Sequence, residues 1–232
     1  MNNPTPTSGI ILINKPSEPT SHDMVYKLRK ITGIKKIGHA GTLDPFASGL
    51  MIMAIGREAT KTLADYIGMN KEYVATVRLG ASSSTLDRTG IIIKNNCQPI
   101  VLSSIKKELQ KIIGIQDQTP PMYSAKKIGG KKLYKLARKG IEIDRKPKQV
   151  EIFHVKNIEY NWPLLEFNIK VSSGTYIRTI ADELGKSLGC GALLNELQRV
   201  SIGNYSIDDA FEINQINSDN WRALLIRGVA NL

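Results

Sequence analysis

Cysteine, histidine and aromatic residues are all scarce in this chain of 232 residues. The two cysteines, Cys97 and Cys190, lie far apart in the sequence without the close spacing of a zinc site, which argues against a disulfide-stapled scaffold and a cysteine-rich metal centre. The three histidines, His22, His39 and His154, form no metal-binding pattern, so we expect no metal. Aromatic residues make up only 6% of the chain, which is few for a protein that stacks many single-stranded bases.

Long hydrophobic runs are also missing. No apolar stretch approaches the ~20 residues that a membrane-spanning helix needs. Residues 1–8 are polar and lack the basic start and apolar run of a secretory signal. Glycine-rich phosphate loops of the GxGxxG or Walker type are absent, and no serine has the G-x-S-x-G surroundings of a hydrolase nucleophile. Because both a membrane-spanning run and a secretory signal are missing, we expect a cytoplasmic protein that has no membrane association.

Negative charge is in short supply, because 32 lysines and arginines face 21 acidic residues, giving a net charge of +11. Such a positive balance favours a polyanionic partner. Ten of the cations and only two acids lie between residues 122 and 148, and we name this range the basic segment. Its lysines could serve solubility alone, but clustered like charges favour nucleic acid, and the low aromatic content favours folded RNA. The RNA-binding candidates are Lys126, Lys127, Lys131, Lys132, Arg138 and Lys148.

A loop with almost no charge of its own spans residues 38–50, with the sequence GHAGTLDPFASGL. Its single acid, Asp44, precedes Pro45, which disfavours a helical backbone at that position. Gly41 and Gly49 allow sharp turns on either side. An isolated acid on such a loop suits a nucleophile or a base. The alternative is an Asp-Pro turn whose side chain only bonds nearby amides.

Periodicity and turn residues predict strands and helices mixed without a regular βαβ rhythm. Strands are expected at residues 9–14, 50–55, 71–79, 150–160 and 164–172, the last two forming a hairpin. Helices are expected at residues 21–32 (capped by Ser21 and ended by Gly33), 58–66, from 103 onward, 177–188, 191–198 and 219–227. Residues 33–48 and 80–90 are expected to be loops. This pattern predicts an α+β fold with a largely antiparallel sheet.

Arg178 falls in the first turn of the helix expected at residues 177–188, where a cation is unfavourable to the helix dipole. This placement suggests an anionic partner outside the helix. A carboxylate such as Asp44 would serve, and the pair would keep that acid ionised at neutral pH. A plain surface arginine is the alternative.

Together these segments resemble the bacterial tRNA pseudouridine-55 synthases, the B family of pseudouridine synthases. The resemblance covers about residues 9–212 and rests on ordered blocks. These blocks are Asn14-Lys15-Pro16 with Thr20-Ser21, GHAGTLDPFASGLM, Lys71-Glu72-Tyr73, residues 80–90 with Thr85 and Asp87, PPMYSAK, Tyr134, Ala137-Arg138, GTYIR and LGCGALL. The chain departs from the family pattern at Glu18, where glycine is usual, at Ser83-Ser84, and at Gln198 and Val200.

The resemblance implies the pseudouridine synthase fold, with a catalytic cleft in a single catalytic domain over residues 1–232. It also implies a tRNA-clamping basic insertion at about residues 118–149. Many members of the family carry a further small RNA-binding domain, whereas in this chain we expect no separate C-terminal RNA-binding domain. By the same resemblance Asp44 is the catalytic aspartate, Arg178 is its ion-pair partner and Tyr73 lies against the target base. The substrate-binding candidates are His39, which would occupy the space left by the base, Tyr176, Leu197, Lys15, Gly41 and Thr42.

The implied activity is isomerisation of uridine 55 in the T loop of tRNA to pseudouridine. The enzyme would flip the base, cleave the glycosidic bond, rotate the base and form the C5–C1′ bond. We expect no cofactor, no obligate protein partner and a monomer. The alternatives are a non-catalytic tRNA-folding chaperone, a guide-RNA-dependent synthase, and a synthase that acts on another uridine.

Overall fold

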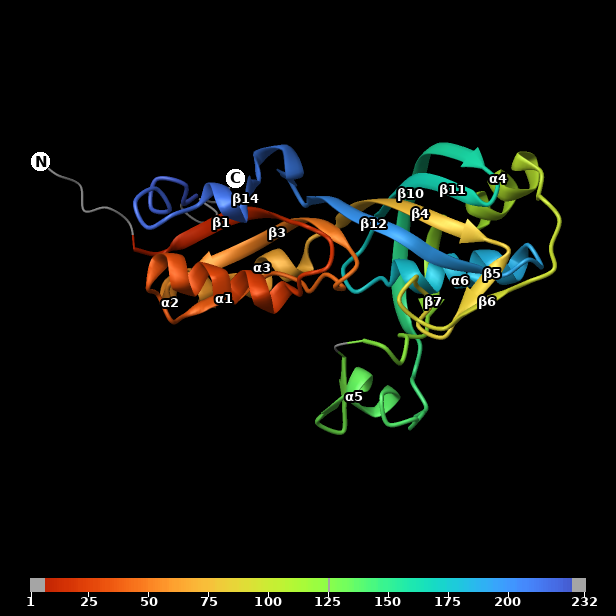
Figure 1. Ribbon diagram of the computed structural model, residues 1–232, viewed down its shortest axis with the longest axis horizontal. Helices are drawn as coiled ribbons and strands as arrows, with labels where there is room; N and C mark the ends of the chain where they lie inside the picture. Colours follow the sequence, from red (N-terminus) through yellow and green to blue (C-terminus); the bar gives the residue numbers. More distant parts are fainter. Residues whose placement is uncertain (1–6, 125, 227–232) are drawn as a thin grey trace, which may run out of the picture. The chain divides into compact units, whose positions relative to one another are not determined.

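The computed structural model describes residues 7–124 and 126–226, and its contacts divide the chain into two compact units. The first unit consists of residues up to 71 together with residues from 198 onward, and the second consists of residues 72–197. Strands β4 (Lys71–Leu79) and β12 (Ala192–Ile202) each contain residues of both units (Figure 1). The single catalytic domain expected over the whole chain stays a prediction.

The first unit is built on the apolar runs of two strands, β1 (Gly9–Lys15) and β3 (Ser48–Ile55), both almost completely buried. Its other helices and strands, in chain order, are α1 (Ser21–Thr32), β2 (Ile37–His39), α2 (Arg57–Lys61), α3 (Leu63–Gly68), β13 (Tyr205–Ser206), β14 (Phe211–Glu212) and two 3-10 turns at Ile207–Asp209 and Ile213–Gln215. Strand β3 pairs antiparallel with β1 and β2, and parallel with the end of β12 at Ser48 and Gly49. A buried cluster including Leu12, Ile52 and Tyr66 forms its core.

The N-cap residue of helix α1 lies one position earlier in the chain than the sequence predicted. Thr20 is the N-cap, and its hydroxyl accepts the Asp23 N–H at 3.1 Å. The Asp23 carboxylate accepts the Thr20 N–H at 2.8 Å, which completes a capping box. Gly33 ends the helix at φ +71°, as expected. The prediction that Ser21 caps the helix is wrong, because its hydroxyl instead bonds the backbone of Leu43.

The second unit contains, besides its parts of β4 and β12, the elements β5 (Ala81–Ser83), β6 (Ile92–Lys94), α4 (Leu102–Lys111), β7 (Gly114–Gln118), β8 (Lys127–Ile128), β9 (Lys131–Lys132), α5 (Leu133–Ala137), β10 (Lys148–Asn161), β11 (Leu164–Val171) and α6 (Ile177–Ser187). Its sheet has the strand order β12-β4-β11-β10-β7. Burial alternates along β4, as in a strand with one face in the core. Helix α4 packs against α6 and β10.

The α+β fold with a mainly antiparallel sheet is confirmed. The strand expected at 71–79, the hairpin of β10 and β11, and the helix expected at 177–188 are all found. The helix expected at 58–66 is instead two short helices separated at Thr62, and the expected loops contain the short strands β2 and β5. None of the helices within the described residues is long and apolar enough to cross a membrane.

The helix expected at residues 191–198 is wrong, since these residues belong to β12. Leu193, Leu194 and Leu197 have the spacing of a helix face, but short apolar runs of this kind suit either structure. Pairing within the sheet decides the outcome, because β12 lies between β3 and β4. The helix expected around 219–227 is not found either: residues 218–224 form turns, and Arg227 lies outside the described residues.

Candidate active site

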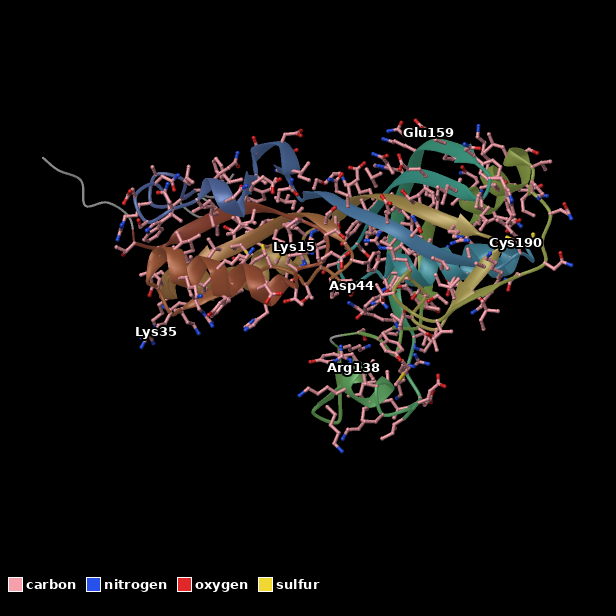
Figure 2. All side chains as sticks on the ribbon, in the orientation of Figure 1. Lys15, Lys35, Asp44, Arg138, Glu159 and Cys190 are labelled. Carbon is pink, nitrogen blue, oxygen red and sulfur yellow. The ribbon has the colours of Figure 1, made fainter. Side chains whose placement is uncertain are left out.

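Asp44 lies on a tight turn of the first unit. Figure 2 shows Asp44 and Lys15 toward the same end of that unit. The Asp44 carbonyl accepts the Ala47 N–H at 3.1 Å, with Pro45 at the second position of the turn. The acid is therefore outside any helix, as predicted, and its backbone forms an Asp-Pro turn, which the sequence offered as the alternative. Gly41 at φ +104° and Gly49 at φ +106° confirm the need for glycine on both sides.

Hydroxyl groups fasten this loop on either side of Asp44. The Ser21 hydroxyl accepts the Leu43 N–H at 2.9 Å and donates to the Leu43 carbonyl at 3.0 Å. The Ser17 hydroxyl donates to the Phe46 carbonyl at 2.7 Å. Because both flanking residues are held, the Asp44 backbone has little freedom to move.

Lys15 is buried, and its ammonium contacts the backbone of the Asp44 loop. Its ammonium donates to the carbonyls of Pro16 and Pro19 at 2.8 Å each and to the carbonyl of Pro45 at 3.2 Å. Burial lowers the pKa of Lys15 to about 8, and the negative charge of Asp44 opposes that shift. Asp44 and Lys15 are therefore electrostatically coupled within the first unit. Contact of Lys15 with substrate stays a prediction.

Two further buried cations lie in the same unit. Arg199 donates from Nε to the Leu50 carbonyl at 2.7 Å and from Nη2 to the Gly41 carbonyl at 3.1 Å. Lys71 donates to two backbone carbonyls at the end of α3, at 2.6 Å each. Burial, and then the charge of Arg199, lower the pKa of Lys71 to about 8. Because carbonyls are neutral, these bonds hold both cations in place without cancelling their charge, and Arg199 places its charge beside Gly41 of the Asp44 loop.

Lys15→Met is expected to flatten the pH dependence of stability above pH 8. Lys15 has a pKa of about 8 in the folded protein against an ordinary lysine pKa of 10.5, so the unfolded chain holds more protons between those values. The free energy of unfolding contributed by this residue therefore rises with pH in that window. Urea titrations from about pH 7.5 to 10.5 should show a smaller rise for the variant than for the wild type. The exposed Lys27→Met serves as the control and should keep the wild-type slope. An equal slope in Lys15→Met and the wild type would contradict the burial argument.

Glu18→Gly is expected to stabilise the protein by about 1 kcal/mol. Glu18 has φ +85°, a conformation that costs a residue with a side chain free energy and that glycine adopts readily. Its N–H donates to the Pro45 carbonyl at 2.8 Å, so the strained residue supports the Asp44 loop. The urea midpoint measures the gain. Asn157→Gly, at φ +51°, should gain less because asparagine tolerates this region, and equal gains would refute the explanation.

His39 and Thr42 also lie in the first unit. His39 ends β2, and its buried Nδ1 has no hydrogen-bond partner among the described residues. Burial, followed by the charge of Arg199, lowers the pKa of His39, so the imidazole is neutral at pH 7. Thr42 is exposed on the loop, whereas Gly41 is half-buried.

Arg178 is the second residue of α6 and is almost completely buried, so the plain surface arginine is excluded. Its Nη1 donates to the Thr85 carbonyl at 3.1 Å and its Nη2 to the Tyr123 carbonyl at 2.7 Å. Its Nε lies 3.7 Å from Oδ2 of the buried Asp87. The second unit thus holds the guanidinium from three directions.

Asp87 is a site residue to which the sequence analysis gave no role. Its Oδ1 accepts the hydroxyls of Thr85 and Thr89 at 2.7 and 2.6 Å and the Thr89 N–H at 2.9 Å. The remaining oxygen faces Arg178. Two signals pointed to it: its place in a block that carries the family resemblance, and the spacing Thr85-x-Asp87-x-Thr89, typical of a turn in which an aspartate bonds its own backbone neighbours.

The remaining candidates of the second unit lie on two strands of the sheet and at the start of α6. Tyr73 lies on the buried face of β4, and Leu197 is buried in β12. Tyr176 is the N-cap of α6, and the Gln118 side chain bonds both sides of its backbone, accepting its N–H at 2.7 Å and donating to its carbonyl at 3.1 Å. Gln118, which the sequence did not single out, therefore fixes where α6 begins.

The basic segment contains a short hairpin, formed by β8 and β9. Helix α5 follows it and is labelled in Figure 1. Lys131, Arg138 and Lys148 are exposed and Lys126 is half-buried. The side chains predicted for RNA binding at Lys127 and Lys132 lie outside the described part of the structure. Arg138, labelled in Figure 2, lies over the Tyr134 ring at 5.6 Å. Lys148 lies against Gly174, in the turn that leads to Tyr176.

The predicted site residues are therefore distributed over both units. Asp44, His39, Lys15, Gly41 and Thr42 belong to the first, and Tyr73, Tyr176, Arg178 and Leu197 belong to the second. An ion pair between Asp44 and Arg178 stays a prediction.

Comparison with known proteins gives consistent matches over nearly the whole chain. Residues 29–177 match the TruB family pseudouridylate synthase (N terminal domain), and residues 178–224 match the tRNA pseudouridylate synthase B C-terminal domain. The tRNA pseudouridine synthase B of Protochlamydia amoebophila is 44% identical over 97% of this chain and 86% of its own length. That of Chlamydia abortus is 46% identical over 88% of this chain and 86% of its own length.

Among solved structures, a chain of a Cbf5-Nop10-Gar1 complex superposes with a TM-score of 0.70 at 25% identity. The match covers 90% of this chain but 53% of that one, so this chain spans about half the length of the solved protein. The likeness supports the pseudouridine synthase fold. With both family models matched in order along its length, this chain belongs to the TruB family of pseudouridylate synthases.

Proposed function

We propose that this chain isomerises uridine 55 in the T loop of tRNA to pseudouridine. Its relatives at 42–46% identity bear the name tRNA pseudouridine synthase B. The observation that carries the chemistry is Asp44 itself: a lone acid on a loop held on both sides, coupled to the buried ammonium of Lys15.

The reaction rearranges bonds without changing the composition of the nucleoside. The N1–C1′ bond breaks, the base turns, and a C5–C1′ bond forms. C5 loses its proton and N1 ends protonated, so nothing is oxidised and no group has to be supplied. An ionised Asp44 can attack C1′ or C6, or remove the C2′ proton, and all three routes require the negative charge. Tyr73 or a water molecule would remove the proton from C5.

Arg178 is proposed to pair with Asp44 and to keep it ionised. Its guanidinium has five donors, and the contacts to Thr85, Tyr123 and Asp87 fix its plane. Asp87 would then be a positioning residue that acts through Arg178. This arrangement supplies a rigid cation for a carboxylate whose charge the reaction needs.

Asp44 can reach the uridine only when its base flips out of the stacked T loop. Unstacking a base costs a few kcal/mol, which binding elsewhere must offset. The basic segment, with a net charge of +8, is proposed to provide that binding through the phosphates of the T arm. Tyr73, Tyr176 and Leu197 would receive the flipped base, and the neutral His39 would occupy the space it leaves.

The purified chain alone should convert one uridine of an unmodified tRNA transcript. Release of tritium from [5-³H]uridine measures turnover, and mapping of the product should give position 55, with a transcript carrying cytidine there as control. The proposal includes a cytoplasmic monomer that needs no partner protein. Product at another position supports the synthase for a different uridine, and dependence on an added guide RNA supports the guided branch. Faster tRNA refolding without tritium release supports the chaperone.

A further inference from the structure

A second cluster of positive charge lies in the first unit, on α1 and the turn that follows it. Residues 22–36 hold five cations and one acid, a net charge of +4. With the +8 of the basic segment, these two stretches account for the whole +11 of the chain and leave about −1 for all other residues. The cations are Lys27, Arg29, Lys30, Lys35 and Lys36, and with Tyr26 they form what we name the α1 face.

Helical geometry puts the four α1 face residues that lie within α1 on the exposed side of the helix. Met24, Val25 and Leu28 are buried on the opposite side, whereas all six residues of the α1 face are exposed. Tyr26 is 54% exposed, and the Lys30 ammonium lies 4.7 Å from the centre of its ring. An exposed aromatic ring among cations is the combination that contacts bases and phosphates of nucleic acids.

The positive charge of this face is not neutralised locally. None of its five cations forms an ion pair with an acid among the residues that the structure describes. The nearby acid, Asp23, is engaged in the capping box through the N–H and hydroxyl of Thr20, and these bonds lower its pKa. Its carboxylate thus bonds mainly the start of the helix, and its weaker electrostatic interaction with Lys27 offsets only one of the five cations.

Stabilisation of the helix dipole explains only part of the cluster. Arg29 and Lys30 lie in the last turn, where cations are favourable. Lys35 and Lys36 lie beyond the helix, and Gly33 already caps its end. The exposed Tyr26 contributes nothing to the dipole. A polyanionic partner accounts for all of these residues together.

Helix α1 is attached to the Asp44 loop at its buried first residue. Ser21, the first residue of α1, bonds both the N–H and the carbonyl of Leu43, next to Asp44. At about 1.5 Å per residue, Lys30 lies roughly 13 Å along the helix from that anchor. An RNA strand with one nucleotide at Asp44 would therefore have neighbouring phosphates within reach of α1.

We propose that the α1 face binds backbone phosphates of the substrate tRNA, as a second electrostatic grip separate from the basic segment. The inference rests on the proposed function for the identity of the RNA. It predicts that α1 contributes to binding and to its salt dependence, with no role in the chemical step.

The test variant combines Lys27→Gln with Lys30→Gln and removes two positive charges from the α1 face. The control variant combines Lys106→Gln with Lys107→Gln and removes the same charge from the exposed side of α4. Affinity for unmodified tRNA is measured between about 50 and 300 mM salt. The α1 variant should raise Kd on the order of tenfold and lower the salt slope by about 2, while the α4 variant keeps the wild-type values. The rate at saturating tRNA should stay within about twofold of wild type in both.

Equal losses in the two variants, or an unchanged slope in the α1 variant, would overturn the inference. Arg29→Gln, made alone, provides a second test with about half the change in slope, and thermal unfolding verifies that each variant is folded. Binding is measured independently of turnover. A tRNA modified elsewhere than position 55 would therefore refute the proposed function and leave the α1 result standing.

Discussion

Asp44→Asn is expected to lower the single-turnover rate of pseudouridine formation by at least roughly a thousandfold. Asparagine has the same shape, but its amide can neither attack carbon nor remove a proton, so each of the three possible first steps fails. The Ser21 and Ser17 bonds that hold the loop involve neighbouring residues and should persist in the variant. Affinity for tRNA should therefore change less than about threefold.

Tritium release and filter binding with a T-arm RNA separate these two effects. Asp65→Asn is a matched control, because Asp65 is an exposed acid of the same unit at the start of α3. It should leave both quantities unchanged. Substantial tritium release by Asp44→Asn would remove Asp44 from the chemistry. Loss of tRNA binding in the same variant would instead make Asp44 a recognition residue.

The elements predicted correctly are those in which the local pattern and the tertiary environment agree. The run GIILIN predicts a strand buried on both faces, and β1 is one. Asn161-Trp162-Pro163 predicts the turn between β10 and β11. In β12 the two sources of information differ: the leucine spacing suits a helix, and pairing in the sheet between β3 and β4 makes it a strand.

The site shows the same division between local and distant information. The position of Asp44 and the glycines around it follow from residues within a few positions of one another. The roles of Asp87 and Gln118 do not, because each acts on the start of α6, distant in the sequence. The burial of Lys15 and Lys71 was equally hidden, since both satisfy their ammonium groups with backbone carbonyls and not with nearby acids.

Arg178→Gln is expected to reduce turnover by at least roughly a hundredfold and to lower the free energy of unfolding by about 3 kcal/mol. The substitution removes the charge that faces Asp87 and leaves the carbonyls of Thr85 and Tyr123 without their donors. Arg178→Lys should retain more stability but regain little activity, because one ammonium cannot reach three partners in a fixed plane. Arg78→Gln, in the partly exposed part of β4, is the control.

A double-mutant cycle with Asp87→Asn separates the structural and catalytic parts of this effect. In Asp87→Asn combined with Arg178→Gln, no unpaired buried carboxylate is left, and the Thr85 and Thr89 bonds to the side-chain oxygen can persist. Stability should therefore recover by about 1–2 kcal/mol over Arg178→Gln alone, as read from urea midpoints. Activity should not recover, because the cation proposed to hold Asp44 ionised is still missing. Recovery of activity together with stability would show that Arg178 acts only by holding the fold, and would leave Asp44 without its proposed partner.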